Sequence, residues 1–458
     1  MSETTGVLRE GDYGTKVGTV EPGGIEEIPQ SDRHGSPIQL LWTWTSPNLE
    51  FATVFVGALG VLAFNLSVMQ SLAAILLGNA LGAAGHAFLS MRGPRYGVPQ
   101  MILGRPAFGR IGNAIPSLMG SLVAGIGWYA VNSVSGAFAL NTLFKVNLKI
   151  SLLIIVLIQV AIAFFGHNLI QIFERYAFPV LAVVFGIACI VSLSKSDLGG
   201  GGHGGGMGGF LLETATIYGY SAGWNPFAAD YARYLPSNSD AKKVGLYAGL
   251  GLFLSTTILE FVGAASMTIA SPADASPTDA FVGHFPTILA KLVLLAIIIG
   301  SIAANVLNIY SGSLSFLATG IKVPSHIRRA IVALVFGIGG FILALSAINN
   351  PKNNYENFLL VIAYWIGPWL GVIVADAVLR RGQNVAHLLF KPDFENLAGP
   401  IAFVVGVIVS IWLFSNQQFY TGLVAKSHSG IGDITFEVGF ALAFVLYWIL
   451  GAKKARNS

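Results

Sequence analysis

The sequence predicts an all-α membrane protein with about twelve transmembrane helices, and three observations support this fold class. Charged residues make up only 10% of the 458 residues, against about 25% in soluble domains. The mean hydropathy is +0.69. Residues 51–91 contain no Asp, Glu, Lys or Arg. That run is long enough for two linked spans, because one helical span needs about 20 apolar residues.

Further apolar runs predict the other spans. Helix is the expected spanning element, because lipid cannot satisfy the open edges of strands. After the two spans within 51–91, the predicted spans lie at about 113–142, 150–168, 176–194, 211–229, 244–270, 286–311, 328–349, 358–379, 397–415 and 432–451.

The positive charges predict the orientation, because Lys and Arg collect in cytoplasmic connections. About twenty of them fall in the N-terminal tail and in the even-numbered connections of this scheme. The odd-numbered connections hold only Lys145, Lys149, Lys195, Lys352 and Lys426. We therefore expect a multi-pass protein of the cell membrane with both termini in the cytoplasm. The net charge of +4 gives no sign of a nucleic-acid partner.

Composition also divides the chain. Residues 1–45 are expected to be a polar cytoplasmic tail, and residues 46–455 a single transmembrane domain. The glycine-rich stretch 199–209 predicts a flexible outer linker between two five-span halves, at about 46–194 and 211–381, with extra helices at about 397–451. His203 within the stretch is a lone histidine, and the sequence predicts no metal site and no disulfide, since Cys189 is the single cysteine.

Two spans in matching positions of the two halves carry signals of a broken helix. The first contains Gly57 and Gly60, and the sixth contains Gly219 and Gly223 followed by Trp-Asn-Pro. Such paired interruptions are typical of transporters, in which the freed backbone groups hold a substrate or an ion near the middle of the bilayer. Close helix packing is the alternative explanation for these glycines.

Polar and aromatic residues recur on the spans that would line one cavity. Trp128 and Asn132 are four residues apart, and Asn305 and Asn308 are three apart, so each pair shares a helix face. Trp224 lies at the break of the sixth span. An aromatic ring can stack on a planar heterocycle, and an amide can donate to and accept from its edge. The pattern predicts a neutral, planar, hydrogen-bonding ligand, although each Asn alone could instead join two helices.

Several motifs resemble the nucleobase:cation symporter-1 family, in particular its purine–cytosine permease branch. The resemblance extends over about residues 40–455 and includes several motifs in order and spacing. They are Gly104-Arg-Pro-Ala-Phe-Gly-Arg110, Asn113-Ala-Ile-Pro-Ser117, Gly127-Trp-Tyr-Ala-Val-Asn132, Ser221-Ala-Gly-Trp-Asn-Pro-Phe-Ala-Ala-Asp-Tyr-Ala-Arg-Tyr234 and Asn308-Ile-Tyr-Ser311.

The resemblance implies a five-plus-five inverted-repeat transporter of the amino-acid/sodium symporter type with two additional C-terminal helices. It implies that Trp128 and Trp224, or Tyr220 beside it, sandwich a base. Asn132 and Asn308 would contact its edge, Asn305 less certainly, and we add Ser221 as a neighbouring candidate. The implied activity is import of a purine base or cytosine by alternating access. The implied partners are a small nucleobase and the lipid bilayer, and the oligomeric state stays open.

The coupling ion is where the chain departs from the sodium-dependent members. These carry a Ser/Thr pair on the eighth span, where this chain has Ala303 and Ala304, and methyl groups cannot ligate a hard cation. A shifted register would bring Ser301 or Ser311 there instead. The resemblance to fungal members favours H+ over Na+, with no cofactor. Glu260 within the seventh span is the candidate proton carrier, since ionised groups at that depth are costly, and a paired or hydrogen-bonded structural role is the alternative.

Other classes fit the sequence less well. A channel is expected to show filter segments or rings of charge. An enzyme would need clustered acid–base residues, whereas the eight His residues are scattered. Other planar ring compounds stay open as substrates, namely allantoin, hydantoin, uracil, thiamine and pyridoxine.

Overall fold

The computed structural model describes residues 24–165, 167–271, 276–321 and 328–457. Over these residues the chain is helical, with two isolated β-bridges and no strand. The α-helices are α1 (Gln39–Thr45), α2 (Phe51–Leu62), α3 (Val68–Ser90), α4 (Gly93–Tyr96), α5 (Gln100–Leu103), α6 (Arg105–Phe108), α7 (Ala114–Leu122), α8 (Tyr129–Phe144), α9 (Leu148–Phe165), α10 (His167–Lys195), α11 (Gly206–Ala222), α12 (Ala228–Ala232), α13 (Ala241–Ser266), α14 (Pro277–Val282), α15 (Thr287–Ala318), α16 (Arg328–Ala347), α17 (Pro351–Leu379), α18 (Ala386–Leu389), α19 (Ala398–Phe414), α20 (Leu423–Ser427) and α21 (Thr435–Asn457). Short turns of other helix types are η1 (Gln30–Asp32), η2 (Ser46–Asn48), η3 (Val123–Trp128), η4 (Asn225–Phe227) and η5 (Ser429–Ile431).

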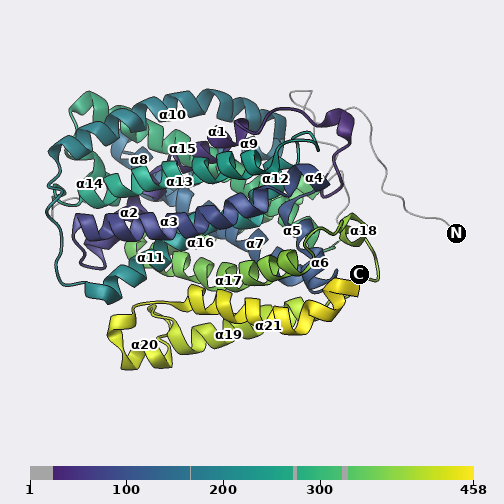
Figure 1. The fold of residues 1–458 in the computed structure, drawn as a ribbon. Coiled ribbons are helices and arrows are strands. Elements are labelled where there is room, and N and C mark those ends of the chain that lie inside the picture. The colour runs from purple at the N-terminus through teal and green to yellow at the C-terminus, as the bar shows by residue number, and fades with distance from the viewer. Residues whose placement is uncertain (1–23, 166, 272–275, 322–327, 458) are drawn as a thin grey trace.

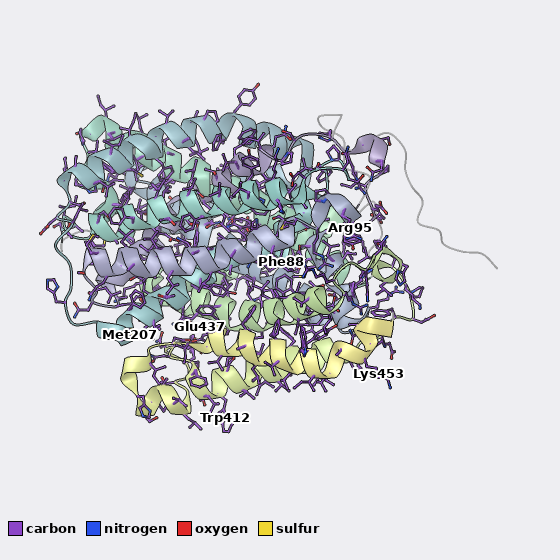
Figure 2. The ribbon with its side chains drawn as sticks, viewed as in Figure 1. Phe88, Arg95, Met207, Trp412, Glu437 and Lys453 are labelled. Atoms are coloured by element: carbon purple, nitrogen blue, oxygen red, sulfur yellow. The ribbon has the colours of Figure 1, made fainter. Side chains whose placement is uncertain are left out.

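The long helices run side by side and share two ends (Figure 1). We call the end that holds α4, α5, α18 and the last residues of α21 the terminal end, and the end that holds α14 and α20 the distal end. Figure 2 shows Arg95 and Lys453 at the terminal end and Met207 at the distal end.

Long apolar helices make this a multi-pass membrane protein. Among the described residues, seven helices are long and apolar enough to cross a membrane, or eight when the bent pair Gln39–Asn48 and Phe51–Leu62 counts as one span. All twelve predicted ranges overlap a helix. Several of these helices are shorter apolar segments, such as Ala398–Phe414, so a count of twelve spans stays a prediction.

Two groups of helices form the body of the protein. In the first, which we call the bundle, α2 and α3 pack with α11 and α13. In the second, which we call the scaffold, α8, α9, α15 and α16 pack around a buried cluster that includes Tyr129, Leu152, Ile309 and Phe336. The candidate site residues lie where these two groups meet.

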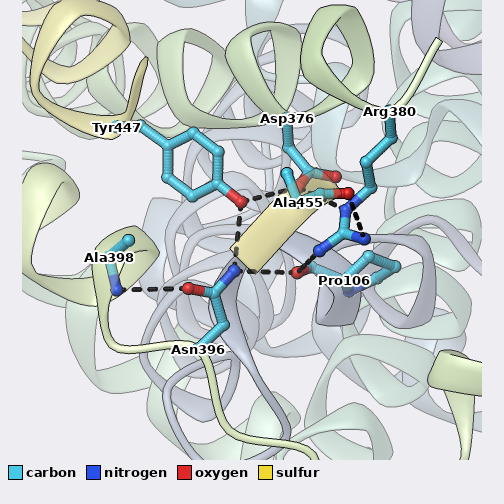
Figure 3. A network of polar contacts seen from close by, with 7 residues as sticks. All are labelled: Pro106, Asp376, Arg380, Asn396, Ala398, Tyr447 and Ala455. Atoms are coloured by element: carbon cyan, nitrogen blue, oxygen red, sulfur yellow. Dashed lines mark hydrogen bonds and ion pairs between the residues drawn. The ribbon is translucent and has the colours of Figure 1, made fainter. Parts of the chain in front are cut away.

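The last two long helices, α19 and α21, pack against each other and against α17 at one side of the molecule (Figure 1). Asp376 on α17 anchors them, because it accepts from Tyr447 Oη of α21 at 2.6 Å and from Arg380 Nε at 2.8 Å. Asn396 donates to Tyr447 Oη and to the carbonyl oxygen of Pro106, both at 3.0 Å (Figure 3). On the outer side of α19, Trp412 is 53% exposed (Figure 2).

Two sequence expectations about connections are wrong. The predicted tail of residues 1–45 is too long, because α1 already forms the first half of the bent span. The glycine-rich stretch 199–209 is not a free linker. Gly202 and Gly205 donate backbone hydrogen bonds of 2.9 Å to Leu66 and Asn65, and helix α11 begins at Gly206. The stretch therefore packs on the turn between α2 and α3.

Close packing of α2 against α13 requires glycine on both helices. A Cβ built on Gly263 of α13 would collide with the carbonyl oxygen of Val54, and one on Gly57 of α2 would collide with that of Glu260. We expect Gly263→Leu to destabilise the protein by about 1–3 kcal/mol or more, because overpacking forces helices apart. The melting temperature of the detergent-purified protein, followed by size-exclusion chromatography, measures this effect.

The matched control is Gly186→Leu on α10, where a built Cβ meets no atom within 4 Å. This change should leave the melting temperature the same or raise it, because leucine favours helix over glycine. Equal stability of the two variants would contradict the packing described for α2 and α13.

Candidate functional site

The first span breaks between η2 and α2, where the chain bends by 64°. Glu50 is the residue before α2 and has an extended backbone with φ −145° and ψ 167°. The prediction of a broken first span is therefore right in kind and wrong in place, because Gly57 and Gly60 lie inside α2. Their role is packing, since a Cβ on Gly60 would collide with Glu213 and Ser71.

The sixth span breaks after α11, at Gly223 and Trp224, as its sequence predicts. A Cβ on Gly223 would lie 3.2 Å from Trp128 Nε1, so the glycine lets the third span approach the break. Gly219 lies within α11 and packs against the backbone of Leu359 instead. Ser221 is not directed into the site, because its hydroxyl donates to the Ile217 carbonyl oxygen at 3.2 Å and lies against Gly82 of α3.

Trp128 forms the centre of an aromatic cluster at this meeting point. It ends the π-helical turn η3, and such turns are frequent at functional sites. Its ring makes edge-on contacts with Tyr220 and Phe358, each at 5.2 Å between centroids, and with Tyr355 at 6.3 Å. The cluster therefore joins the third span to α11 of the bundle and to α17.

Trp224 lies on the other side of the first-span break. Its indole N–H donates to Asn48 Oδ1 at 3.1 Å, and its ring contacts Trp44 edge-on at 5.7 Å. Asn48 Nδ2 donates in turn to the Trp44 carbonyl oxygen at 2.7 Å. The two breaks are thus joined directly by side chains, with Trp224 bonded to Asn48 and Tyr220 Oη bonded to Thr53 Oγ1.

The three amides predicted from the sequence lie together between α8 and α15. Asn305 donates to the Tyr129 carbonyl oxygen at 2.9 Å and to Ser133 Oγ at 3.2 Å, and its Oδ1 accepts from Asn132 at 3.1 Å and from Asn308 at 3.4 Å. Asn305 is therefore a structural link. Asn132 Oδ1 and Asn308 Oδ1 are buried and have no hydrogen-bond partner among the described residues, which leaves two acceptors for a ligand.

A cavity of about 280 Å³ lies on the distal side of Trp128, between α2, α8, α16 and α17. Tyr355 and Phe358 line it and also contact Trp128, so these two rings of the cluster lie between the cavity and Trp128. Tyr355 stacks on Phe55 of α2 at 5.6 Å and donates to the Ala52 carbonyl oxygen at 3.0 Å. The bundle and α17 are therefore closed over Trp128 by aromatic contacts.

The terminal side of the site is covered by the segment before α1. Arg233, after α12, donates to the Gly24 carbonyl oxygen at 2.9 Å, and Arg33 donates to the Pro94 carbonyl oxygen at 2.6 Å. The structure thus combines an open distal cavity with a closed terminal side.

Glu260 lies on α13, whereas Ala303 and Ala304 of the eighth span lie on α15. Glu260 on α13 accepts from Asn79 Nδ2 of α3 at 2.5 Å and is fully buried. Ala303 and Ala304 are fully buried on α15. Ser301 does not replace a lost ligand, because its hydroxyl donates to Ile298 within α15 at 2.9 Å and its carbonyl accepts from Gln159 of α9.

Sequence reasoning missed Asn48, Glu50 and Thr53 in the first span, and Tyr355 and Phe358 in α17. Asn48 and Glu50 were missed because they precede the apolar run that starts at Phe51, and Thr53 because one hydroxyl within that run gives no signal of a site. Two polar residues directly before an apolar run could have indicated the break. The α17 aromatics carry no local signal that separates them from ordinary core residues.

Two broken spans joined at an aromatic and amide cluster, within a body of long apolar helices, define a membrane transporter with a central substrate site. The comparisons with known proteins agree with this class. Residues 27–439 match the family described as permease for cytosine/purines, uracil, thiamine, allantoin. The chain therefore belongs to this permease family, and it is a transporter rather than an enzyme.

Relatives of known name extend over nearly the whole chain. A putative purine-cytosine permease of Bacillus subtilis is 29% identical over 94% of this chain and 96% of its own length. A purine-cytosine permease of Emericella nidulans is 28% identical over 94% of this chain and 88% of its own.

Two solved structures of Mhp1, a nucleobase-cation-symport-1 family transporter, have the same fold. The inward-facing conformation has a TM-score of 0.75 over 96% of this chain and 94% of its own. The closed conformation, with bromovinylhydantoin bound, has a TM-score of 0.69 over 95% of each chain. At 19% identity both comparisons concern the fold alone.

If Trp128 stacks on the substrate, Trp128→Ala should weaken substrate binding by about 1–3 kcal/mol, the usual contribution of base–aromatic stacking, and reduce uptake accordingly. Expression and membrane insertion should not change. Uptake of radiolabelled cytosine by cells, normalised to surface protein, measures the effect. Trp412→Ala, on the exposed side of α19, is the matched control. Normal uptake by Trp128→Ala would contradict the stacking role.

Proposed function

We propose that this protein is a secondary active symporter that imports a purine nucleobase or cytosine across the cell membrane, coupled to protons. One observation carries the proposal: Trp128 lies one helical turn before Asn132, which is joined through Asn305 to Asn308, and the Oδ1 atoms of Asn132 and Asn308 are buried without a partner among the described residues. A flat aromatic ring with adjacent acceptors suits a planar ring that carries N–H groups. The names of the Bacillus and Emericella relatives point to the same substrates.

The proposed mechanism is alternating access in a five-plus-five repeat with twelve spans and cytoplasmic termini. The base would enter through the distal cavity, which would then face the outside. Tyr355 and Phe358 must move to admit it to Trp128, because they line the cavity and contact that ring. Release to the cytoplasm would require the covering contacts of Arg233 and Arg33 to open. The bundle would rock against the scaffold between the two states.

Proton coupling is supported by the side chains of the eighth span. Na+ prefers oxygen ligands. The side chains of Ala303 and Ala304 have no oxygen, and the Ser301 hydroxyl is hydrogen-bonded within its own helix. Glu260 is the proposed proton carrier, since its carboxyl is fully buried between α13 and α3, where Asn79 donates to it.

Uptake into proteoliposomes tests the substrate and the ion together. We expect radiolabelled cytosine to accumulate when the outer solution is more acidic than the lumen, and unlabelled adenine to compete. An imposed sodium gradient at equal pH should drive no accumulation. Accumulation driven only by sodium would contradict proton coupling. Failure of every nucleobase to enter or compete would contradict the proposed substrate class. Allantoin, hydantoin, thiamine and pyridoxine would then be the next substrates to test.

Glu260→Gln tests the carrier. The amide keeps a partner for Asn79 but cannot release a proton, so proton-driven accumulation should be lost. Exchange of external for internal cytosine, which needs no net proton movement, should persist. Glu437→Gln on α21, outside the bundle, is the matched control and should keep both activities. Accumulation by Glu260→Gln at the wild-type level would exclude Glu260 as the carrier.

A further inference from the structure

The bundle contains a second buried carboxyl, Glu213, which neither the proposed stacking nor the proposed proton carrier uses. It is fully buried in the second turn of α11, and neither of its carboxylate oxygens has a hydrogen-bond partner among the described residues. No Lys or Arg occurs in α2, α3 or α11, and those of α13, Lys242 and Lys243, lie in its first turn. On α17, which also packs on α11, Lys352 interacts with Glu356. An unpaired carboxylate is costly in such surroundings, so Glu213 is suited to holding a proton.

Glu213 is directed at the second half of the broken first span. A Cβ built on Gly60 of α2 would lie 2.2 and 2.3 Å from its two carboxylate oxygens and 2.3 Å from Ser71 Oγ of α3. The carboxyl and the hydroxyl therefore lie close together, at a point where only glycine fits on α2. Ser71 Oγ is buried and also has no hydrogen-bond partner among the described residues. Three helices of the bundle thus meet around polar atoms that can exchange a proton.

Glu213 lies closer to the distal end of the molecule than the proposed carrier Glu260 does. Helix α11 starts next to Met207 at the distal end (Figure 2), and Ser71 lies in the first turn of α3. Asn79, which donates to Glu260, lies about two turns further along α3. The two carboxyls interact electrostatically, and Oε1 of Glu260 has no partner among the described residues. They therefore form an outer and an inner carboxyl within the bundle.

Helix α11 also connects the outer carboxyl to the candidate substrate site. Tyr220 comes seven residues after Glu213, about two turns, so both side chains lie on one face of α11. That face packs on α2, with Glu213 at Gly60 and Tyr220 bonded to Thr53. Tyr220 contacts Trp128 as well. A proton at Glu213 would therefore lie between the two half-helices that border the candidate substrate site.

We propose that Glu213 is the outer member of a proton relay, which takes a proton from the distal side and passes it to Glu260. This inference rests on the proposed function. The first step transfers a proton from a hydronium ion of the outer solution to a Glu213 carboxylate oxygen and leaves water. The second step breaks that O–H bond and forms one on Glu260, which returns Glu213 to the carboxylate. Chains of buried acidic side chains are typical of proton pathways in transporters.

Uptake into proteoliposomes tests the relay with variants of the full-length protein. When the outer solution is more acidic, Glu213→Gln should accumulate radiolabelled cytosine about tenfold less than wild type or worse, because an amide cannot release a proton. Exchange of external for internal cytosine should persist. Glu213→Asp keeps a carboxyl and should recover part of the accumulation. Thr216→Val, which removes a buried hydroxyl bonded within α11, is the matched control and should keep both activities.

The double variant Glu213→Gln/Glu260→Gln tests whether the two carboxyls act in one pathway. It should accumulate no less cytosine than the weaker single variant, because residues of one pathway are not additive. Wild-type accumulation by Glu213→Gln would overturn the relay while leaving Glu260 and nucleobase transport in place. Loss of exchange in both Glu213→Gln and Glu213→Asp would assign Glu213 a structural role instead.

A further measurement uses wild type alone and does not depend on the folding of a variant. Dicyclohexylcarbodiimide reacts with protonated carboxyls in apolar surroundings. Mass spectrometry should locate its adduct on Glu213, and the treated protein should lose proton-driven accumulation. Absence of an adduct at Glu213 would overturn the relay. Untreated wild type that accumulates no nucleobase under a pH gradient would instead contradict the proposed function itself.

Discussion

The structure depends on one constraint: backbone polar groups within a bilayer must be paired inside the protein. Unbroken helices meet this requirement by themselves, and the break at Leu49–Glu50 does not. The first span is therefore held by side chains from other spans, with Asn48 joined to Trp224, Thr53 to Tyr220, and the Leu49 backbone packed on Gly300. A helix break within the membrane is stable here because the sixth and eighth spans enclose it.

The same contacts explain why the candidate site residues gather at this place. Trp224 and Tyr220 flank the break of the sixth span and bind the break of the first, so the bundle's two irregular segments act as one unit. The scaffold contributes Trp128 and the amides of α8 and α15, which are joined through Asn305. A ligand at the interface contacts both groups of helices, and its binding can therefore be coupled to their relative movement.

Much of the fold and part of the site could be predicted from the sequence. Apolar runs located the long helices, and the spacing of Trp128 with Asn132 and of Asn305 with Asn308 indicated faces that do meet. The position of the first break could not be predicted from Gly57 and Gly60. Glycine is common both where a helix breaks and where two helices pack closely. The structure shows packing at both positions, because α13 approaches Gly57 and side chains of α11 and α3 approach Gly60. Likewise Ser221 shares a motif with Trp224, but the neighbouring α3 determines where its hydroxyl lies.

The central claim is that a planar base binds at the junction of the two broken spans. An experimental structure of the wild-type protein with bound cytosine tests it most directly. The account predicts the base between Trp128 and the break of the sixth span, with its edge toward Asn132 and Asn308. Density for the base only in the distal cavity lined by Phe51 and Phe55, with Trp128 uncontacted, would contradict the account.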